Sequence, residues 1–286
     1  MKKGMKLRIV LGAAMIAATV GLLYGDWWLE HADAELAAGL PLGVVMVALT
    51  VVGYFELARL AGALGVRMAV FAGPLGAAAL AALPVWQQIL PDSAGGFLPL
   101  LVLAVTTAAV FLEQMLSARI EDGFRRIAAT LLAVVYLGAG GAMILAVRTT
   151  FGVPALAMFL MAVKGTDIGA YFTGSAIGRH KMIPWLSPGK SWEGLVGGVV
   201  FAAAVSALCA WGFRLGELLT PWQALGFGAV VALVGQFGDL CESLLKRSAA
   251  AKDSGSLVPE FGGLLDILDS PLLAAPAAYL VLLALS

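Results

Sequence analysis

Acidic and basic side chains gather in the run GDLCESLLKRSAAAKDSGSLVPEFGGLLDILDS, residues 238–270. At its start Asp239, Glu242 and Lys246 follow i, i+3, i+7 spacing, which places them on one face of a helix. Carboxylate oxygens are the hard ligands that hold Mg²⁺, and an ammonium group neutralises phosphate oxygens. This helix face therefore predicts a place where a cation and a phosphate group are handled together.

The rest of the run repeats the same residue types after a Ser/Pro/Gly break. Arg247, Lys252 and Asp253 precede the break, and Asp266 and Asp269 follow it, three residues apart. Ionisable groups near hydrocarbon are costly, so several of them in a chain this poor in charge indicate function. The whole run predicts a metal and polyphosphate site.

A second constellation is the segment SPGKSWEG, residues 187–194. Gly-Lys-Ser resembles part of a P-loop, but that motif needs a glycine five positions before Gly189, where Pro184 stands. The remaining prediction is a turn that carries Lys190 to the start of a helix, whose N-terminal N–H groups favour a phosphate. Glu193 has two interpretations, a site residue or a side chain that only balances the helix dipole.

Three polar residues precede that segment inside an apolar stretch. Lys164 and Asp167 are three residues apart, and Tyr171 follows one helical turn later. The lysine and the aspartate are either a mutual ion pair at the membrane boundary or groups that face the site. Both interpretations stay open from the sequence alone.

The elements that position these residues are expected to be membrane helices. Of 286 residues, 61% are hydrophobic and 13% are charged, against about 25% charged in a soluble domain. Backbone groups in lipid must be satisfied within their own segment, so long apolar spans form helices. The prediction is an all-α polytopic protein with about nine spans, near residues 7–24, 38–56, 68–88, 97–116, 127–147, 153–172, 192–212, 222–240 and 263–285. A GxxxG pair, Gly194 and Gly198, predicts close helix packing.

The positions of the basic residues predict the orientation of these spans. Lys and Arg are retained on the cytoplasmic side, and with a cytoplasmic N-terminus nearly all of the 18 basic residues fall in segments on that side. Only Arg148 and Arg214 fall in outer connections. Residues 1–150 are expected to be a region of membrane spans, and residues 151–286 the catalytic region. The predicted location is the inner (plasma) membrane, with the active face cytoplasmic.

With these residues in view, the chain resembles the phosphatidate cytidylyltransferases, or CDP-diacylglycerol synthases. The resemblance covers roughly residues 160–270. It rests on residues 243–247 (SLLKR), 252–255 (KDSG), Pro259, Gly262, Gly263, Asp266 and Asp269, in order and spacing, and on residues 169–171 (GAY), 178–181 (GRHK) and 187–194.

The resemblance implies that CTP and phosphatidate from the inner leaflet react to give CDP-diacylglycerol and diphosphate. It implies Mg²⁺, with a monovalent cation as a further candidate, and partners limited to these substrates and the bilayer, with a homodimer open and no nucleic acid. The expected catalytic residues are Asp239, Asp253 and Lys252, and the expected metal ligands are Asp239, Asp253, Asp266 and Asp269. The expected substrate-binding residues are Asp167, Tyr171, Ser187, Lys190, Glu193, Lys246 and Arg247.

Two departures from the family pattern keep alternatives open. Phe261 stands where histidine is usual, and Ile267 where arginine is usual. These changes raise the alternative of a diverged, inactive relative. Another magnesium-dependent phosphotransferase acting on lipid phosphates would want the same residues, and a transporter with Lys164 and Asp167 on its pathway is a third alternative.

Overall fold

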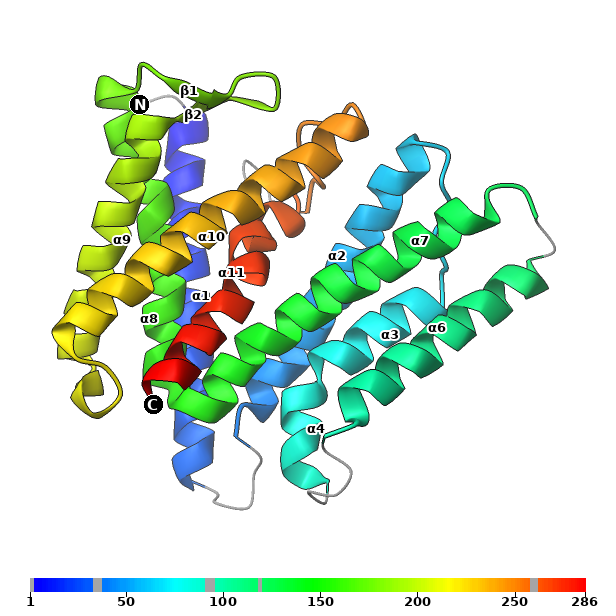
Figure 1. Cartoon of the computed structure of the whole chain (residues 1–286), viewed down its shortest axis with the longest axis horizontal. Helices are drawn as coiled ribbons and strands as arrows, with labels where there is room; N and C mark the ends of the chain where they lie inside the picture. The colour runs from blue at the N-terminus through cyan, green and yellow to red at the C-terminus, as the bar shows by residue number, and fades with distance from the viewer. Residues whose placement is uncertain (1–2, 33–37, 91–95, 118–119, 258–261) are drawn as a thin grey trace. The chain divides into compact units, whose positions relative to one another are not determined.

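The computed structural model describes residues 3–32, 38–90, 96–117, 120–257 and 262–286 (Figure 1). In these ranges the chain is helical apart from one short hairpin and its connections. Seven of the described helical stretches are long and apolar enough to cross a membrane. The prediction of an all-α polytopic membrane protein is confirmed.

The chain divides into two compact units, residues 1–145 with 249–267 and residues 146–248 with 268–286. The first unit contains α1 (Lys3–Ala32), α2 (Leu40–Ala63), α3 (Ala72–Ala81), α4 (Leu83–Ile89), α6 (Leu98–Leu116), α7 (Gly123–Ala133) and the π-helical turn η1 (Val134–Ala139). The second contains most of α8 (Gly140–Ile177), β1 (Lys181–Ile183), β2 (Ser187–Ser191), α9 (Trp192–Gly212), the 3₁₀ turn η2 (Leu215–Glu217), α10 (Pro221–Ser248) and most of α11 (Leu265–Leu285).

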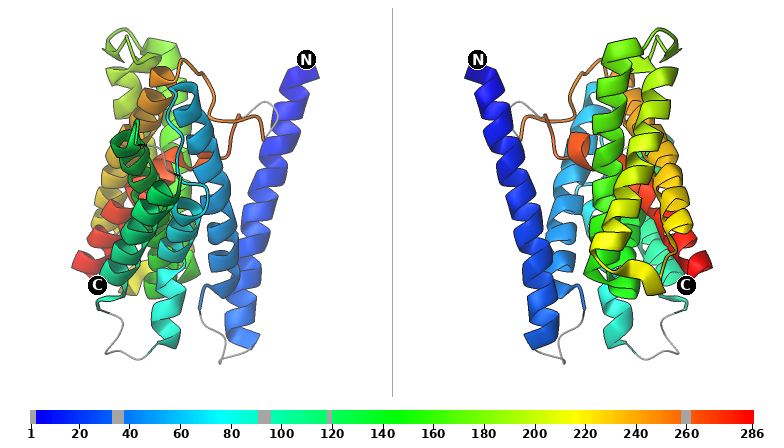
Figure 2. Two further views of the ribbon diagram at one scale, coloured as in Figure 1. Left: turned by 90° about the vertical axis from the view of Figure 1, so that its right-hand side faces the viewer. Right: turned by 90° about the vertical axis from the view of Figure 1, so that its left-hand side faces the viewer.

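Helix α2 is a central element of the first unit and contacts α1, α3, α7 and η1 (Figure 2). Its Tyr54 is fully buried and donates a hydrogen bond to the carbonyl of Ala69, 2.6 Å away. The span expected at 68–88 is instead two short helices, α3 and α4, which meet at Ala82. Pro84 favours the break, because proline lacks an N–H and fits best in the first turn of a helix, where it stands in α4.

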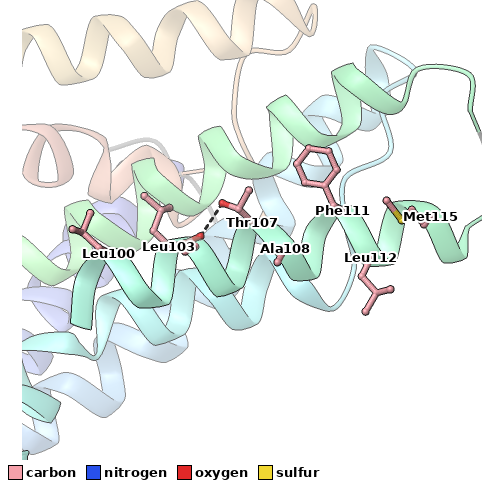
Figure 3. Close-up of a pocket in the computed structure, with 8 residues that line it drawn as sticks. Leu100, Leu103, Thr107, Ala108, Phe111, Leu112 and Met115 are labelled. Atoms are coloured by element: carbon pink, nitrogen blue, oxygen red, sulfur yellow. Dashed lines mark hydrogen bonds between the residues drawn. The ribbon is translucent and has the colours of Figure 1, made fainter. Parts of the chain in front are cut away.

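Helix α6 exposes an apolar face along its length (Figure 3). A shallow groove there is lined only by residues of α6 itself, among them Leu100, Phe111 and Met115. Thr107 keeps its hydroxyl out of this surface by donating a hydrogen bond to the carbonyl of Leu103, at 2.7 Å. Such a face suits contact with hydrocarbon.

Helix α8 is interrupted at Gly152, whose φ is 85°. Pro154 follows two residues later and removes one backbone donor. The spans expected at 127–147 and 153–172 are therefore not separated by a loop. They belong to the continuous series α7, η1 and α8, which has a kink at Gly152. Arg148, predicted to lie in an outer connection, is instead part of α8 and only 1% exposed.

Helix α9 packs closely against α8 and α10 in the second unit. A Cβ atom at Gly198 would lie 2.9 Å from the carbonyl oxygen of Thr166 on α8, so only glycine permits this approach. The close helix packing predicted from the GxxxG pair is confirmed. This packing places the polar end of α8 beside the start of α9.

The segment before α9 is a strand where the sequence predicted a turn. Strands β1 and β2 are antiparallel, with Lys181 opposite Ser191 and Ile183 opposite Ser187. Ser191 then caps α9, because its hydroxyl oxygen accepts a hydrogen bond from the N–H of Gly194 at 3.1 Å. The hairpin thereby fixes the course of the backbone on both sides of Lys190.

Candidate active site

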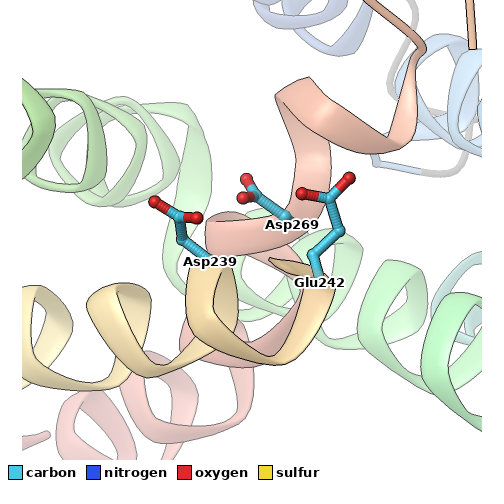
Figure 4. Close-up of side chains that lie close together, drawn as sticks. All are labelled: Asp239, Glu242 and Asp269. Atoms are coloured by element: carbon cyan, nitrogen blue, oxygen red, sulfur yellow. The ribbon is translucent and has the colours of Figure 1, made fainter. Parts of the chain in front are cut away.

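Three carboxylates meet in the second unit (Figure 4). Asp239 and Glu242 come from α10 and Asp269 from α11, and each offers an oxygen within 4.8 Å of the others. Glu242 and Asp269 are 0% and 6% exposed, whereas the Asp239 side chain is 33% exposed. We call these three side chains the carboxylate cluster.

The local fold explains why these carboxylates meet. Asp239 and Glu242 lie one helical turn apart on α10, as their spacing predicts. A Cβ atom at Gly238 would lie 2.8 Å from the backbone oxygen of Asp269, so the missing side chain lets α11 approach α10 closely. Gly238 therefore allows Asp269 to lie close to Asp239 and Glu242.

Two lysines balance the cluster. The ammonium group of Lys190 on β2 lies 2.8 Å from Oδ2 of Asp239, and that of Lys246 lies 2.5 Å from Oε2 of Glu242. Both lysine side chains are largely buried, at 16% and 12% exposure. Buried charges are tolerated only when paired, so these ion pairs hold the cluster in place.

The charge and donor types of the cluster fit a divalent cation. With every group ionised, three carboxylates and two ammonium groups leave one net negative charge among the described side chains of the cluster and its lysines. Carboxylate oxygens are the donors that hard cations such as Mg²⁺ prefer. The donor set therefore suits the cation that the family resemblance implies.

A cavity of about 310 Å³ opens beside Asp239, at the lower end of the range for small-molecule sites. It is lined by α8, β2, α9 and α10, including Asp167, Tyr171, Lys190 and Gln236. Asp167 pairs with Lys164 at 3.4 Å, so their mutual ion pair is present and Asp167 also faces the cavity. Its walls combine anionic, cationic and aromatic groups suited to a phosphorylated ligand.

Four other expected substrate-binding residues lie outside the lining of this cavity, namely Glu193, Ser187, Lys246 and Arg247. Glu193 accepts hydrogen bonds from the backbone N–H of His180 at 3.2 Å and lies 2.5 Å from its ring Nδ1. Both residues line a separate surface pocket together with Arg179. Ser187 is half-buried at the start of β2, where it pairs with Ile183.

The loop between α10 and α11 belongs to the first unit, so Asp253 and Asp266 are described apart from the cluster. Lys252 and Asp253 are exposed. Oδ2 of Asp266 accepts hydrogen bonds from the N–H and hydroxyl of Ser254, at 2.9 and 2.8 Å, and from Gly263 N–H at 2.8 Å. Phe261 lies outside the described residues.

Helix α10 also ends in basic residues. Arg247 is exposed in its last turn, next to the buried Lys246. Ile267, at the position where the family usually has arginine, lies in the first turn of α11 and is half-buried. Arg247 remains a predicted phosphate-binding residue.

The sequence alone assigns no functional role to two carboxylates, Glu242 and Glu56. The i, i+3, i+7 spacing places Glu242 on the same helix face as Asp239, but only its complete burial in the structure distinguishes it from a surface glutamate. Glu56, on α2, lies in a half of the chain without clustered functional groups. An acidic residue inside an apolar span was the only signal there.

Fold and site together define an integral membrane protein that holds carboxylates and lysines around a polar cavity. The chain belongs to the cytidylyltransferase family, whose model matches residues 6–285. The family resemblance predicted from the motifs is confirmed.

Individual relatives agree with this assignment. The phosphatidate cytidylyltransferase of Pseudomonas aeruginosa is 35% identical over 274 residues, covering 95% of this chain and 94% of that protein. That of Bacillus subtilis is 29% identical over 286 residues, with 97% of each chain covered. That of Mycobacterium bovis is 42% identical over 123 residues, which span 43% of this chain but only 39% of the relative's length.

Proposed function

We propose that this protein is a phosphatidate cytidylyltransferase of phospholipid biosynthesis. A phosphate oxygen of phosphatidate attacks the α-phosphorus of CTP, a new P–O–P linkage forms, and the bond to the β-phosphate breaks. CDP-diacylglycerol and diphosphate are the products, so atoms and charges balance without a further reactant. The attacking oxygen needs little activation, because a phosphate monoester with a second pKa of about 6 is largely ionised at neutral pH.

One observation carries this proposal. In a membrane protein of the cytidylyltransferase family, the buried carboxylate cluster and its lysines adjoin a polar cavity. Phosphoryl and nucleotidyl transfer depend on positioning and on charge neutralisation more than on a protein nucleophile. The arrangement supplies both, and two relatives named phosphatidate cytidylyltransferase match this chain over nearly their full length.

Asp239, Glu242 and Asp269 are the side chains that we expect to hold Mg²⁺. When bound, the cation would act as a Lewis acid toward the nucleotide phosphates. This ligand set differs from the one inferred from the motifs. Glu242 is added, and Asp253 and Asp266 are left out because they belong to the first unit, where Oδ2 of Asp266 accepts from backbone and hydroxyl donors.

The other residues act on charge and orientation. Lys190 pairs with Asp239, and both line the cavity, where the ammonium group can move from the carboxylate to a phosphate oxygen of the substrate. Asp167 and Tyr171 line the same cavity and would orient the bound ligand. Lys252 and Asp253, exposed on their loop, would contribute a further cation and carboxylate to the reaction.

The active face is proposed to be cytoplasmic, in the inner membrane. Basic residues accumulate in the segments that the orientation rule assigns to the cytoplasm, and CTP is a cytoplasmic nucleotide. Phosphatidate would then arrive from the inner leaflet. Cysteine substitutions at the exposed residues Lys181 and Lys252 test this orientation. An impermeant thiol reagent should label both cysteines only from the cytoplasmic side of sealed vesicles.

The direct test of function is diphosphate release by the purified full chain in nanodiscs with Mg²⁺, CTP and phosphatidate. We expect release that needs all three components, together with a CDP-diacylglycerol product. Replacing phosphatidate by another lipid phosphate separates the phosphotransferase alternative, because labelled cytidylate would then appear on that lipid. No release with any acceptor would indicate the inactive relative and would refute the proposal.

Asp253→Asn tests the loop contribution to the same reaction. We expect this variant to lose CTP-dependent conversion of phosphatidate, because it loses one negative charge with little change of shape. It should remain folded in detergent, since Asp253 is exposed. Full activity of the variant would remove Asp253 from the catalytic residues.

A further inference from the structure

The side chain of Glu56, on α2, is hydrogen-bonded to the loop that carries Lys252 and Asp253 and to the start of α11. The residue is buried, with 9% of its surface exposed. It accepts hydrogen bonds from the backbone N–H groups of Leu264 and Leu265, both at 2.8 Å. These two residues lie where α11 begins, so the carboxylate satisfies N–H groups that have no partner within the helix.

Ser254 connects Glu56 to the same loop. Its hydroxyl lies 3.1 Å from Oε2 of Glu56 and 2.8 Å from Oδ2 of Asp266. Its backbone N–H donates to Asp266 at 2.9 Å, and its carbonyl accepts from the guanidinium of Arg59. Every polar group of Ser254, the residue directly after Asp253, is therefore held, and two of the side chains that hold it come from α2.

Two glycines of the loop fit against the Glu56 carboxylate. A Cβ atom at Gly255 would lie 2.5 Å from its Oε1, and one at Gly263 would lie 2.6 Å from its Oε2. A Cβ atom does not come this close to an oxygen atom in proteins, so a side chain at either position would displace the carboxylate. The glycines of the motif thus give Glu56 access to the loop backbone.

We propose that Glu56 is a positioning residue for catalysis: through Ser254 and the start of α11 it fixes the loop that presents Lys252 and Asp253. The inference rests on the proposed function, because it assumes that these two residues act in the reaction. It assigns a part in turnover to the N-terminal half of the chain, where the sequence shows no cluster of functional groups.

A carboxylate is needed at this position because each of its two oxygens accepts a backbone N–H, one from Leu264 and one from Leu265. Glutamine has the same shape as glutamate, but one of its two terminal atoms is an NH₂ donor. In either orientation of the glutamine amide in Glu56→Gln, that NH₂ group would face the backbone N–H of Leu264 or of Leu265, and that N–H would lose its acceptor. A buried N–H without an acceptor then favours an open loop.

The test compares Glu56→Gln with a matched control, Glu113→Gln. Glu113 on α6 also accepts N–H groups at the start of a helix, from Val70 at 2.6 Å and Ala72 at 2.7 Å, but these lie at α3, away from the loop. Both variants, Glu56→Asp and the wild-type full chain are compared in nanodiscs. The measurements are kcat, KM for CTP, melting temperature and amide hydrogen exchange of residues 249–265.

We expect Glu56→Gln to lower kcat by about tenfold to a hundredfold, because misplaced catalytic groups cost that much. Amide exchange of residues 249–265 should rise in the same variant. Glu56→Asp, which keeps the charge, should recover part of the kcat and of the protection. Glu113→Gln should lower the melting temperature with kcat within about twofold of wild type.

Two results would overturn the inference. One is a Glu56→Gln protein with wild-type kcat and wild-type exchange in the loop. The other is a loss of kcat in Glu113→Gln that matches the loss in Glu56→Gln at equal melting temperature, which indicates a general structural effect. If Glu56→Gln fails to fold, Arg59→Met tests the same loop, because Arg59 is exposed and should tolerate replacement.

Failure of the proposed function is distinguishable from failure of this inference. Wild-type protein without diphosphate release refutes the function, whatever Glu56 does. Hydrogen exchange of the loop in the Glu56 variants needs no turnover, so it still reports whether Glu56 holds the loop. An active wild type with an unchanged loop in Glu56→Gln refutes the inference alone.

Discussion

The two units use their carboxylates in opposite ways. In the first unit, Glu56 and Asp266 direct their oxygens at backbone N–H groups and at one serine hydroxyl. In the second unit, the carboxylate cluster faces two lysine ammonium groups beside a cavity. Backbone donors cannot leave when a ligand arrives, whereas a lysine side chain can turn to a phosphate. Carboxylates held by backbone donors therefore shape the protein, and those held by lysines are available to a cation.

The largest expected effect breaks the cluster itself. Asp239→Asn removes one charge that we assign to the cation and releases Lys190 from its partner. We expect kcat for diphosphate release to fall by about a thousandfold, as for loss of a major electrostatic contact in an active site. Helical content in detergent should stay near wild type, whereas the melting temperature should fall, because the largely buried Lys190 loses its partner. An active Asp239→Asn protein would mean that the cluster is structural, like the first unit's carboxylates.

A second large effect concerns the buried ion pair of the cluster. Lys246→Met leaves Glu242 without its lysine partner at 0% exposure. Removal of one member of a buried pair costs about 3 kcal/mol of unfolding free energy. Unfolding in a graded mixture of detergent and sodium dodecyl sulfate, followed by circular dichroism, measures this change. A Lys246→Met protein as stable as wild type would show that the pair contributes charge for the ligand and little to the fold.

A third prediction distinguishes Asp253, in the loop between α10 and α11, from Asp266, in the first turn of α11. Asp266→Ala removes the acceptor of three hydrogen bonds, from Ser254 and Gly263, and we expect a loss of about 2 kcal/mol in stability. Asp253→Ala should change stability by less than about 0.5 kcal/mol, because its side chain is exposed. The same unfolding measurement compares both variants. Equal losses of stability would contradict the division of roles between Asp253 and Asp266.

The sequence predicts more of the second unit than of the first, for a physical reason. The length of the apolar segments predicts the membrane helices, and helical spacing predicts that Asp239 and Glu242 share one helix face. Both predictions succeed because both signals are local in the chain. The contact of Glu56 with Leu264 joins residues 208 positions apart. No periodicity encodes such a contact, so its existence depends on tertiary packing. The strand at residues 187–191 escaped prediction similarly, because its partner strand, not its own composition, makes it extended.

A small effect is also expected at the exposed ion pair of the second unit. Lys164 and Asp167 are 3.4 Å apart, with side chains 51% and 47% exposed, far less enclosed by the protein than Lys246 and Glu242. Lys164→Met should therefore cost less than about 1 kcal/mol in stability, against the larger loss expected for Lys246→Met. Asp167 lines the cavity, so the loss of its partner should act on ligand binding, as a changed KM for CTP with kcat near wild type. Parallel unfolding and initial-rate measurements on the two lysine variants test this contrast. A stability loss in Lys164→Met as large as that in Lys246→Met would show that burial is not what distinguishes the two pairs.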